Sequence, residues 1–199
     1  MNLDNSKIQI IIDIYQTLFS NQIYPDYFTQ SESNTILVNN FQGESTSNSA
    51  QIELRGNFKK SFDIKIGYNY LDIFRIEHGH KHRLPFHSKH HILNTISYQP
   101  INKNWKIDCN NHWNGKKRLI GENENGRELM SRPYIINNIQ FTQRIKNWDL
   151  YIGCENISNF RQENPIIGWE DPFGENFDIS NIWGPTKGRE FYIGLRLTL

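Results

Sequence analysis

The sequence predicts an all-β protein: an antiparallel, up-and-down transmembrane β-barrel fold with about eight strands. Three observations predict this fold class. Apolar and polar residues alternate with a period of two in several segments, as they do in strands with one apolar and one polar face. No window repeats apolar residues at helical spacing. Short turns alternate strictly with long polar loops, like the short periplasmic turns and long extracellular loops of a membrane barrel.

The predicted strands follow one another along the whole chain. They cover residues 7–17, 47–57, 62–70, 90–99, 105–110, 131–143, 148–155 and 190–199. In two of the weaker strands, Asn94 and Asn137 interrupt the apolar face. The alternation is clearest in the last strand. Its apolar stripe is predicted to face lipid and consists of Phe191, Ile193, Leu195, Leu197 and Leu199.

The connections between the predicted strands fall into two classes. Short turns occupy residues 57–60, 100–103 and 145–147, and long polar loops occupy residues 18–46, 73–89, 115–130 and 157–188. Long loops at every second connection are uncommon in compact soluble domains. Aromatic residues near strand ends suit the interfacial girdles of a membrane barrel, and they are Tyr15, Tyr98, Trp105, Trp148 and Phe191. A soluble β-sandwich or lipocalin-like barrel gives the same alternation and remains the alternative.

The composition excludes several classes of protein. The 199 residues include 22 basic and 21 acidic ones, so no global field steers nucleic acid to the chain, and no nucleic-acid partner is expected. No apolar stretch approaches the roughly 18 residues of a membrane-spanning helix. The N-terminal residues lack the pattern of a secretory signal, so this chain alone is expected to carry no export signal. Recognisable catalytic and cofactor motifs are missing, so we expect no enzyme and no cofactor.

Several segments resemble those of one known family. Residues 177–196 resemble the last extracellular loop and closing strand of TonB-dependent outer-membrane receptors, and residues 155–166 resemble their penultimate strand where it leaves the membrane. Residues 84–90 are similar to the family's loop that enters a downward strand. Residues 113–118 are similar to the exit from the next upward strand, and residues 13–17 together with 21–23 to an earlier exit. In their order and spacing, these segments extend over nearly the whole chain, which therefore resembles the C-terminal part of a family member.

The resemblance implies a barrel of about 22 strands with an N-terminal plug in its lumen. Such a receptor takes up a scarce nutrient, here expected to be an iron–siderophore or similar metal chelate, with energy delivered by TonB. At roughly 25 residues per strand and connection, about 22 strands need roughly 550 residues. We therefore interpret residues 1–199 as the C-terminal portion of a receptor barrel, with no plug domain and no signal peptide, whose parent protein lies in the outer membrane.

The resemblance also implies partners. These are outer-membrane lipid, the barrel-assembly machinery that reads the closing strand, the TonB complex through the absent N-terminal part, and a small-molecule or metal-chelate substrate. A different interpretation stays open: a self-contained small β-barrel, either embedded in the membrane or acting as a soluble ligand binder. In a membrane segment the apolar strand faces contact lipid, whereas in a soluble barrel they form the core.

Histidines are concentrated in one predicted loop. Six of the seven lie between His78 and His91. His78, His80 and His82 occupy alternate positions, which lets their imidazoles point the same way in an extended backbone. Because imidazole binds zinc, copper, nickel or iron, these three residues are the candidate metal ligands. The alternative is a polar, solvated loop that tolerates histidine.

The last long loop carries the candidate ligand contacts. Trp169, Phe173 and Trp183 lie on a loop stiffened by prolines, and exposed aromatic residues of this kind can contact a substrate. The alternative is that they pack against neighbouring loops as a lid. Residues 116–118 form a basic run, for which contact with anionic lipopolysaccharide or an anionic ligand is one interpretation and a solvated face is the other.

Overall fold

The computed structural model describes residues 7–26, 37–41, 43–77, 80–122, 128–174 and 177–198. No helix in this part of the chain is long and apolar enough to cross a membrane. The regular elements are strands: β1 (Lys7–Phe19), β2 (Gln22–Asp26), β3 (Leu37–Phe41), β4 (Glu44–Phe58), β5 (Phe62–Glu77), β6 (His80–Arg83), β7 (His90–Tyr98), β8 (Trp105–Asn114), β9 (Arg118–Glu122), β10 (Glu128–Met130), β11 (Tyr134–Ile145), β12 (Trp148–Glu155) and β13 (Glu190–Leu197).

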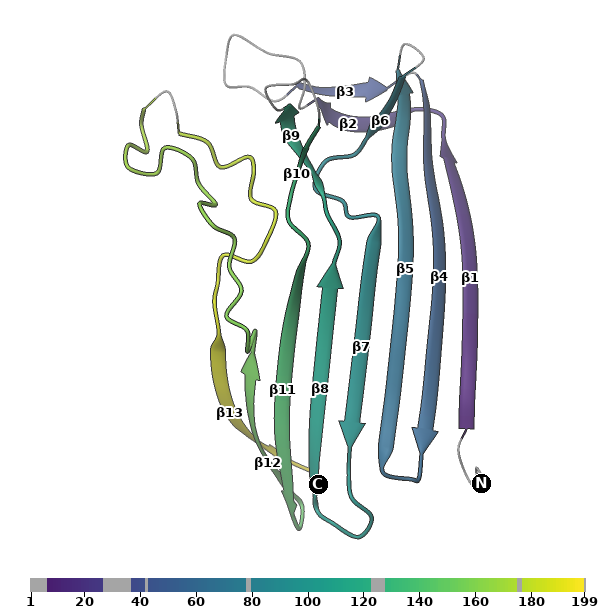
Figure 1. Cartoon of the computed structure of the whole chain (residues 1–199), viewed down its shortest axis with the longest axis vertical. Coiled ribbons are helices and arrows are strands. Elements are labelled where there is room, and N and C mark those ends of the chain that lie inside the picture. Colours follow the sequence, from purple (N-terminus) through teal and green to yellow (C-terminus); the bar gives the residue numbers. More distant parts are fainter. Residues whose placement is uncertain are drawn as a thin grey trace.

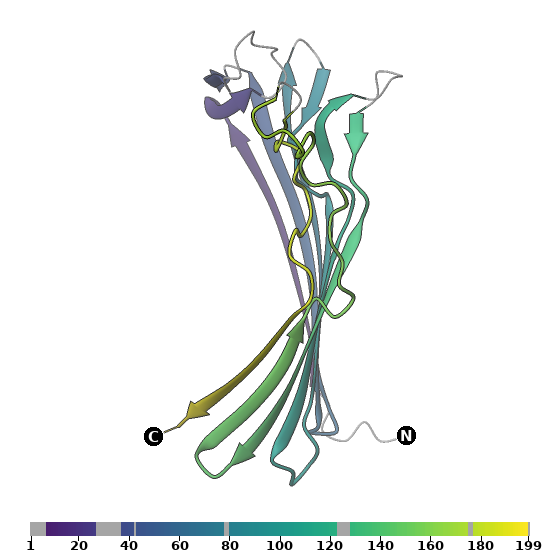
Figure 2. The ribbon, with the colours of Figure 1, turned by 90° about the vertical axis from the view of Figure 1, so that its left-hand side faces the viewer.

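Eight long antiparallel strands form one curved and twisted sheet (Figures 1 and 2). Their spatial order is β1-β4-β5-β7-β8-β11-β12-β13, so each long strand pairs with the long strands next to it in sequence. The outermost strands, β1 and β13, do not pair with each other within the described residues. The prediction of an up-and-down, partial barrel is confirmed. A self-contained closed barrel requires a pairing of β1 with β13 that this sheet does not contain.

The short and long connections lie at opposite ends of the sheet, as predicted (Figure 1). The turn from β4 to β5 has Lys59 and Lys60 at φ of 51° and 55°, and the turn from β11 to β12 has Lys146 at 55°. Positive φ in a tight hairpin matches the right-handed twist of the strands it joins. At the other end, the long connections add the hairpins β2–β3 and β9–β10, and the short strand β6 pairs with β5.

The register aligns residues of like character across the strands. One row on what we call the apolar face contains Ile12, Ile52, Tyr68, Ile92, Trp113 and Ile135. One row on the opposite, polar face contains Gln9, Arg55, Lys65, Thr95, Asn110 and Asn138. Because successive side chains of a strand point to opposite faces, the alternation in the sequence sorts the residues onto these two faces.

The apolar face is not covered by other parts of the described chain. Ile14 exposes 78% of its surface, and of the described hydrophobic residues only Phe41 and Cys154 are buried. A soluble sandwich or lipocalin-like barrel would turn this face into its core, whereas a membrane barrel turns it to lipid. The closing strand follows the same rule, with exposures of 75%, 72%, 64% and 44% at Phe191, Ile193, Leu195 and Leu197. Leu199, the last predicted residue of that stripe, lies outside the described residues.

An aromatic row borders the apolar face near the short turns. Phe62 stacks on Tyr98 at 4.4 Å between ring centroids, Tyr98 meets Trp105 edge-on at 5.6 Å, and Trp105 lies 6.1 Å from Phe141. Such a row is typical of the interfacial girdle of a membrane barrel. The prediction for Tyr15 is wrong: it follows Ile14 in β1 and therefore lies on the polar face, opposite Ser49.

Candidate functional site

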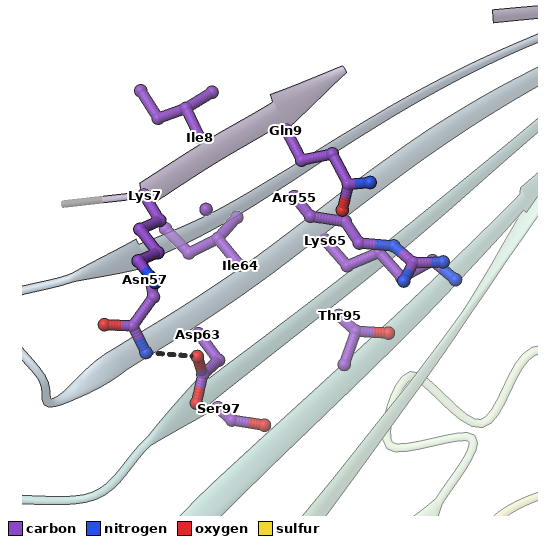
Figure 3. Close-up of a pocket in the computed structure, with 11 residues that line it drawn as sticks. Lys7, Ile8, Gln9, Arg55, Asn57, Asp63, Ile64, Lys65, Thr95 and Ser97 are labelled. Atoms are coloured by element: carbon purple, nitrogen blue, oxygen red, sulfur yellow. Dashed lines mark hydrogen bonds between the residues drawn. The ribbon is translucent and has the colours of Figure 1, made fainter. Parts of the chain in front are cut away.

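The polar face begins, on the β1 side, with a groove of about 730 Å³ near the short turns (Figure 3). It is bordered by β1, β4, β5 and β7. The carboxylate of Glu53, which is only 6% exposed, pairs with Arg55 and lies 2.9 Å from Lys65. Asn57 donates a hydrogen bond of 2.6 Å to Asp63. Arg55, Lys65, Asn57 and Asp63 line the groove and are held by these contacts, while Ile8 and Ile64 give it an apolar part as well.

A second polar groove of about 340 Å³ lies between β8, β11, β12 and β13. Arg144 holds Asp149 with two hydrogen bonds, of 2.7 Å from Nε and 3.0 Å from Nη2. Lys106 lies 2.8 Å from the carboxylate of Asp108. Bidentate arginine–carboxylate pairs fix both side chains more firmly than a single contact does. The polar face thus carries charges of both signs at set positions.

Two tyrosines cover two glycines on this face, where β12 meets β13. Tyr192 pairs with Gly153 and Tyr151 pairs with Gly194. A Cβ atom added at Gly153 would lie 2.2 Å from the ring of Tyr192, and one added at Gly194 would lie 2.3 Å from the ring of Tyr151. Only glycine leaves room for these rings to lie across the strands.

The last long loop, residues 156–189, is tied together by Gln162. This side chain is only 6% exposed. Its Oε1 accepts hydrogen bonds from the backbone N–H groups of Trp183, at 2.7 Å, and Gly184, at 2.9 Å. Its Nε2 donates to the carbonyl of Asn181 at 2.9 Å. One buried amide therefore holds the outgoing and returning arms of the loop side by side.

An aromatic cluster fixes this loop against the polar face. Tyr134, which belongs to that face, stacks on Phe160 at 5.1 Å and lies 5.9 Å from Trp183. Lys117 donates to the carbonyl of Trp183 at 2.7 Å and lies 5.4 Å from the centre of the Tyr134 ring. Among the predicted ligand contacts, Trp183 is thus part of a packed cluster. Trp169 and Phe173 are exposed, by 63% and 101%.

The structure separates the histidines. His80 and His82 lie on β6, and His78 lies outside the described residues. His90 shares a hydrogen bond of 2.7 Å with the hydroxyl of Tyr68, and His91 shares one of 3.1 Å with Asn114. In the described part of the chain, no three His, Cys, Asp or Glu side chains are grouped so that they could hold a metal ion. The site formed by His78, His80 and His82 stays a prediction.

Gln162 and Tyr134 were not predicted as site residues. An isolated glutamine in a polar loop gives no pattern, and the partners of Gln162 lie about twenty positions further along the chain. Tyr134 lies near Lys117 because β11 pairs with β8, and it meets Trp183 because the last loop folds back over the sheet. The one available signal was the tyrosine itself, at the polar end of a predicted strand.

No protein-family model and no curated protein matches this sequence. Solved structures do match. The chain is similar to the ferric-catecholate import receptor Fiu from E. coli K12, with 15% identity and a TM-score of 0.64 over 98% of this chain and 26% of that one. It is similar to the pyoverdine outer membrane receptor FpvA from Pseudomonas aeruginosa PAO1, with 12% identity and a TM-score of 0.67 over 96% and 27%.

A third similar structure is the siderophore receptor PiuA from Acinetobacter baumannii, with 17% identity and a TM-score of 0.60 over 94% of this chain and 26% of that one. The chain spans about a quarter of the length of these receptors. At such identities the likeness concerns the fold. The fold predicted from the sequence resemblance is confirmed: the chain has the fold of a segment of the β-barrel of TonB-dependent outer-membrane receptors.

Proposed function

We propose that this chain is the C-terminal barrel portion of an outer-membrane receptor that takes up an iron–siderophore or similar metal chelate with energy delivered by TonB. The observation that carries the proposal is the two-faced sheet of eight long strands, which matches a quarter of several iron receptors. The apolar face then contacts lipid and the polar face lines the lumen. Receptors with this fold are transport proteins, and we assign no catalytic residue to this chain.

The two unpaired edges of the sheet support the proposal that it is part of a larger barrel. The backbone groups of β1 and β13 that point away from the sheet have no partner strand within the described residues. Each such group costs several kcal/mol in a bilayer, so the sheet is more stable in lipid when both edges pair with further strands. We propose that further strands of the receptor supply this pairing, and that the barrel-assembly machinery and the TonB complex act on the whole receptor.

The last loop gives this segment its proposed contact with the substrate. Its arms are fixed by Gln162, and the Tyr134 cluster holds it on the side of the polar face. Trp169 and Phe173, exposed on the rest of the loop, are the proposed contacts, since rigidly presented aromatic residues bind ligands at low entropic cost. Trp183 is proposed to position the loop.

Two experiments test the proposal. First, an environment-sensitive fluorophore is attached to a cysteine at Ile12→Cys or at Asp13→Cys, in a chain whose native Cys109 and Cys154 are replaced by alanine. In vesicles, brominated lipids should quench the label at position 12 and not at position 13, because the two side chains point to opposite faces. Equal quenching would contradict the assignment of the faces.

The second experiment measures transport. Deletion of the gene is expected to abolish cellular uptake of one radiolabelled ferric chelate from a panel of siderophores, and the intact gene should restore it. Restoration with Trp169→Ala and Phe173→Ala together should be weaker, whereas the matched change Phe177→Ala on the same loop should restore uptake more fully. Unchanged uptake of every chelate in the deletion strain would contradict the proposed function.

A further inference from the structure

A cavity of about 340 Å³ lies at the long-loop end of the sheet, between β5, the segment before β7 and the segment after β8. Part of its wall is apolar, including Leu71, Leu84 and Trp113. Of its charged lining residues, four are Arg or Lys and one is Asp, which leaves an excess of three positive charges. An apolar wall with a cationic rim matches an anionic amphiphile.

Asp72, the acidic residue of this lining, holds two lysines in place. The Nζ atom of Lys89 lies 2.8 Å from Oδ1 and that of Lys81 lies 2.8 Å from Oδ2, while the carboxylate side chain is only 9% exposed. Lys81 also lies 3.7 Å above the centre of the Phe74 ring. Each ammonium group carries three donors and the ion pair uses one of them. The two lysines are thus positioned in advance, with donors available to an external anion.

The cavity lies directly beyond the apolar face. Ile66, Tyr68, Tyr70 and Asp72 occupy alternate positions of β5, so Asp72 continues the row that faces lipid. His90 pairs with Tyr70 in the register and belongs to the same face. From Ile66 to Asp72 the strand rises about 20 Å. Ile66 therefore lies within the apolar band, and Asp72 lies at the level where the headgroups of a bilayer leaflet begin.

We propose that this cavity binds the phosphate-bearing headgroup of an anionic lipid in the leaflet on the long-loop side of the membrane. The inference rests on the proposed function, because that function places the apolar face in lipid. Lys89 and Lys116 line the cavity, and Lys81 lies beside it through its ion pair with Asp72. These three residues, which we call the lysine rim, bind the phosphate through charge-assisted hydrogen bonds. Trp113 and Leu84 contact the first carbons of the acyl chains. A lipid fits better than a soluble anion because Trp113 and Asp72 lie on the face that lipid covers.

The test uses the full 199-residue chain in detergent micelles. Bound lipid is counted by native mass spectrometry during titration with diphosphoryl lipid A, with lipid A lacking both phosphates, and with sodium phosphate. The variant Lys89→Gln with Lys116→Gln is compared with Lys103→Gln with Lys146→Gln, which removes two exposed lysines from the short turns. We expect the wild type to prefer the phosphorylated lipid. The rim variant should bind it about tenfold more weakly, and the turn variant should bind it like the wild type.

Each result decides the inference. Equal binding of both lipids, or equal losses in the rim and turn variants, overturns it. Inorganic phosphate that competes as well as lipid A overturns the assignment to a lipid. The quenching experiment at positions 12 and 13, run in vesicles on the same purified chain, separates the two proposals. A chain that places position 12 in lipid but shows no phosphate preference refutes the lipid site alone, whereas a chain that places neither position in lipid refutes the proposed function and the lipid site with it.

Discussion

The first half of the sheet, formed by β1, β4 and β5, differs from the second half, formed by β7, β8, β11, β12 and β13. One row of the apolar face crosses both halves. It contains Ile10, Leu54 and Ile66 in the first half, and Asn94, Asn111 and Asn137 in the second. The alternation in the sequence therefore determines which face a residue occupies, while the neighbouring strands determine whether a polar group is tolerated there.

The asparagines occur together for a physical reason. Side chains directly opposite each other on neighbouring strands have Cβ atoms about 4.5–5.5 Å apart, so three aligned amides can satisfy one another in part. Oδ1 of Asn94 is nevertheless buried without a hydrogen-bond partner.

The two halves also differ on the polar face, in the space beside their glycines. A Cβ atom added at Gly67, in the first half, would have no neighbour within 4 Å, whereas Gly153 in the second half is covered by Tyr192. At these two positions the second half leaves less room on the polar face, so an added side chain should be tolerated less well at Gly153 than at Gly67.

The largest effect is expected from a charge on the apolar face of the first half. Ile66→Arg should lower the free energy of unfolding by about 2–4 kcal/mol, because the position lies well inside the band that contacts lipid. Urea titration in phospholipid vesicles measures this change. Gln51→Arg, which places the same side chain on the polar face, is the matched control and should change stability by less than about 1 kcal/mol. Equal losses in both variants would abolish the distinction between the faces.

The two glycines test the packing of the halves. Gly153→Ala should destabilise the chain by about 1–3 kcal/mol, since the new methyl group meets the ring of Tyr192. Gly67→Ala has open space and should be neutral or stabilising by about 0.4–1 kcal/mol, because alanine restricts the unfolded chain. The same urea titration compares them, and a larger loss at Gly67 would reverse the comparison.

The asparagine row predicts a gain in stability. Asn94→Leu should stabilise the chain in vesicles by about 1 kcal/mol, because it removes a buried oxygen that has no partner and extends the apolar row of the first half. Asn69→Leu, on the polar face of β5, serves as the control and should give no gain. If Asn94→Leu destabilised the chain, the amide row would have to make interactions that outweigh its burial.

The smallest effect concerns the exposed end of β13. Lys187 donates a hydrogen bond of 3.0 Å to Glu190, and this contact raises the pKa of the lysine above its ordinary value. The charged lysine is therefore favoured in the folded state, so its small contribution is present at neutral pH and disappears as the pH rises through the raised pKa. NMR titration of Lys187 should show the raised pKa in the wild type and a lower one in Glu190→Gln. An unchanged pKa in that variant would exclude the pair as the cause.

The sequence predicts the long strands because their two faces meet different environments. Trp105, Ile107 and Cys109 alternate with polar residues, so one face of β8 is apolar and the other is polar. The short strands follow no such rule and were missed. β6 is formed by the polar residues His80–Arg83, and it exists because β5 extends beyond the predicted residue 70 and offers an edge for pairing.

The site was predictable only in part. Trp169 and Phe173 stand out in a sequence because aromatic residues in a polar loop are conspicuous. The role of Trp183 in packing depends on Lys117 and Tyr134, which approach it only through the tertiary fold. The cavity with the lysine rim escaped prediction for a similar reason, because Asp72, Lys81 and Lys89 come from three segments joined by ion pairs. Residue patterns along the chain do not show which side chains of distant segments come into contact.

The order of the long strands has a consequence for divergence among related proteins. Because every long strand pairs with its neighbours in sequence, both ends of each long connection are already held at a fixed separation by the sheet. Doubling the length of such a loop costs only about 0.6 kcal/mol in closure entropy. Insertions there leave the register of every pair unchanged, whereas one inserted residue within a strand would reverse its two faces. Whole loops can therefore be exchanged while the pairing of the long strands stays the same.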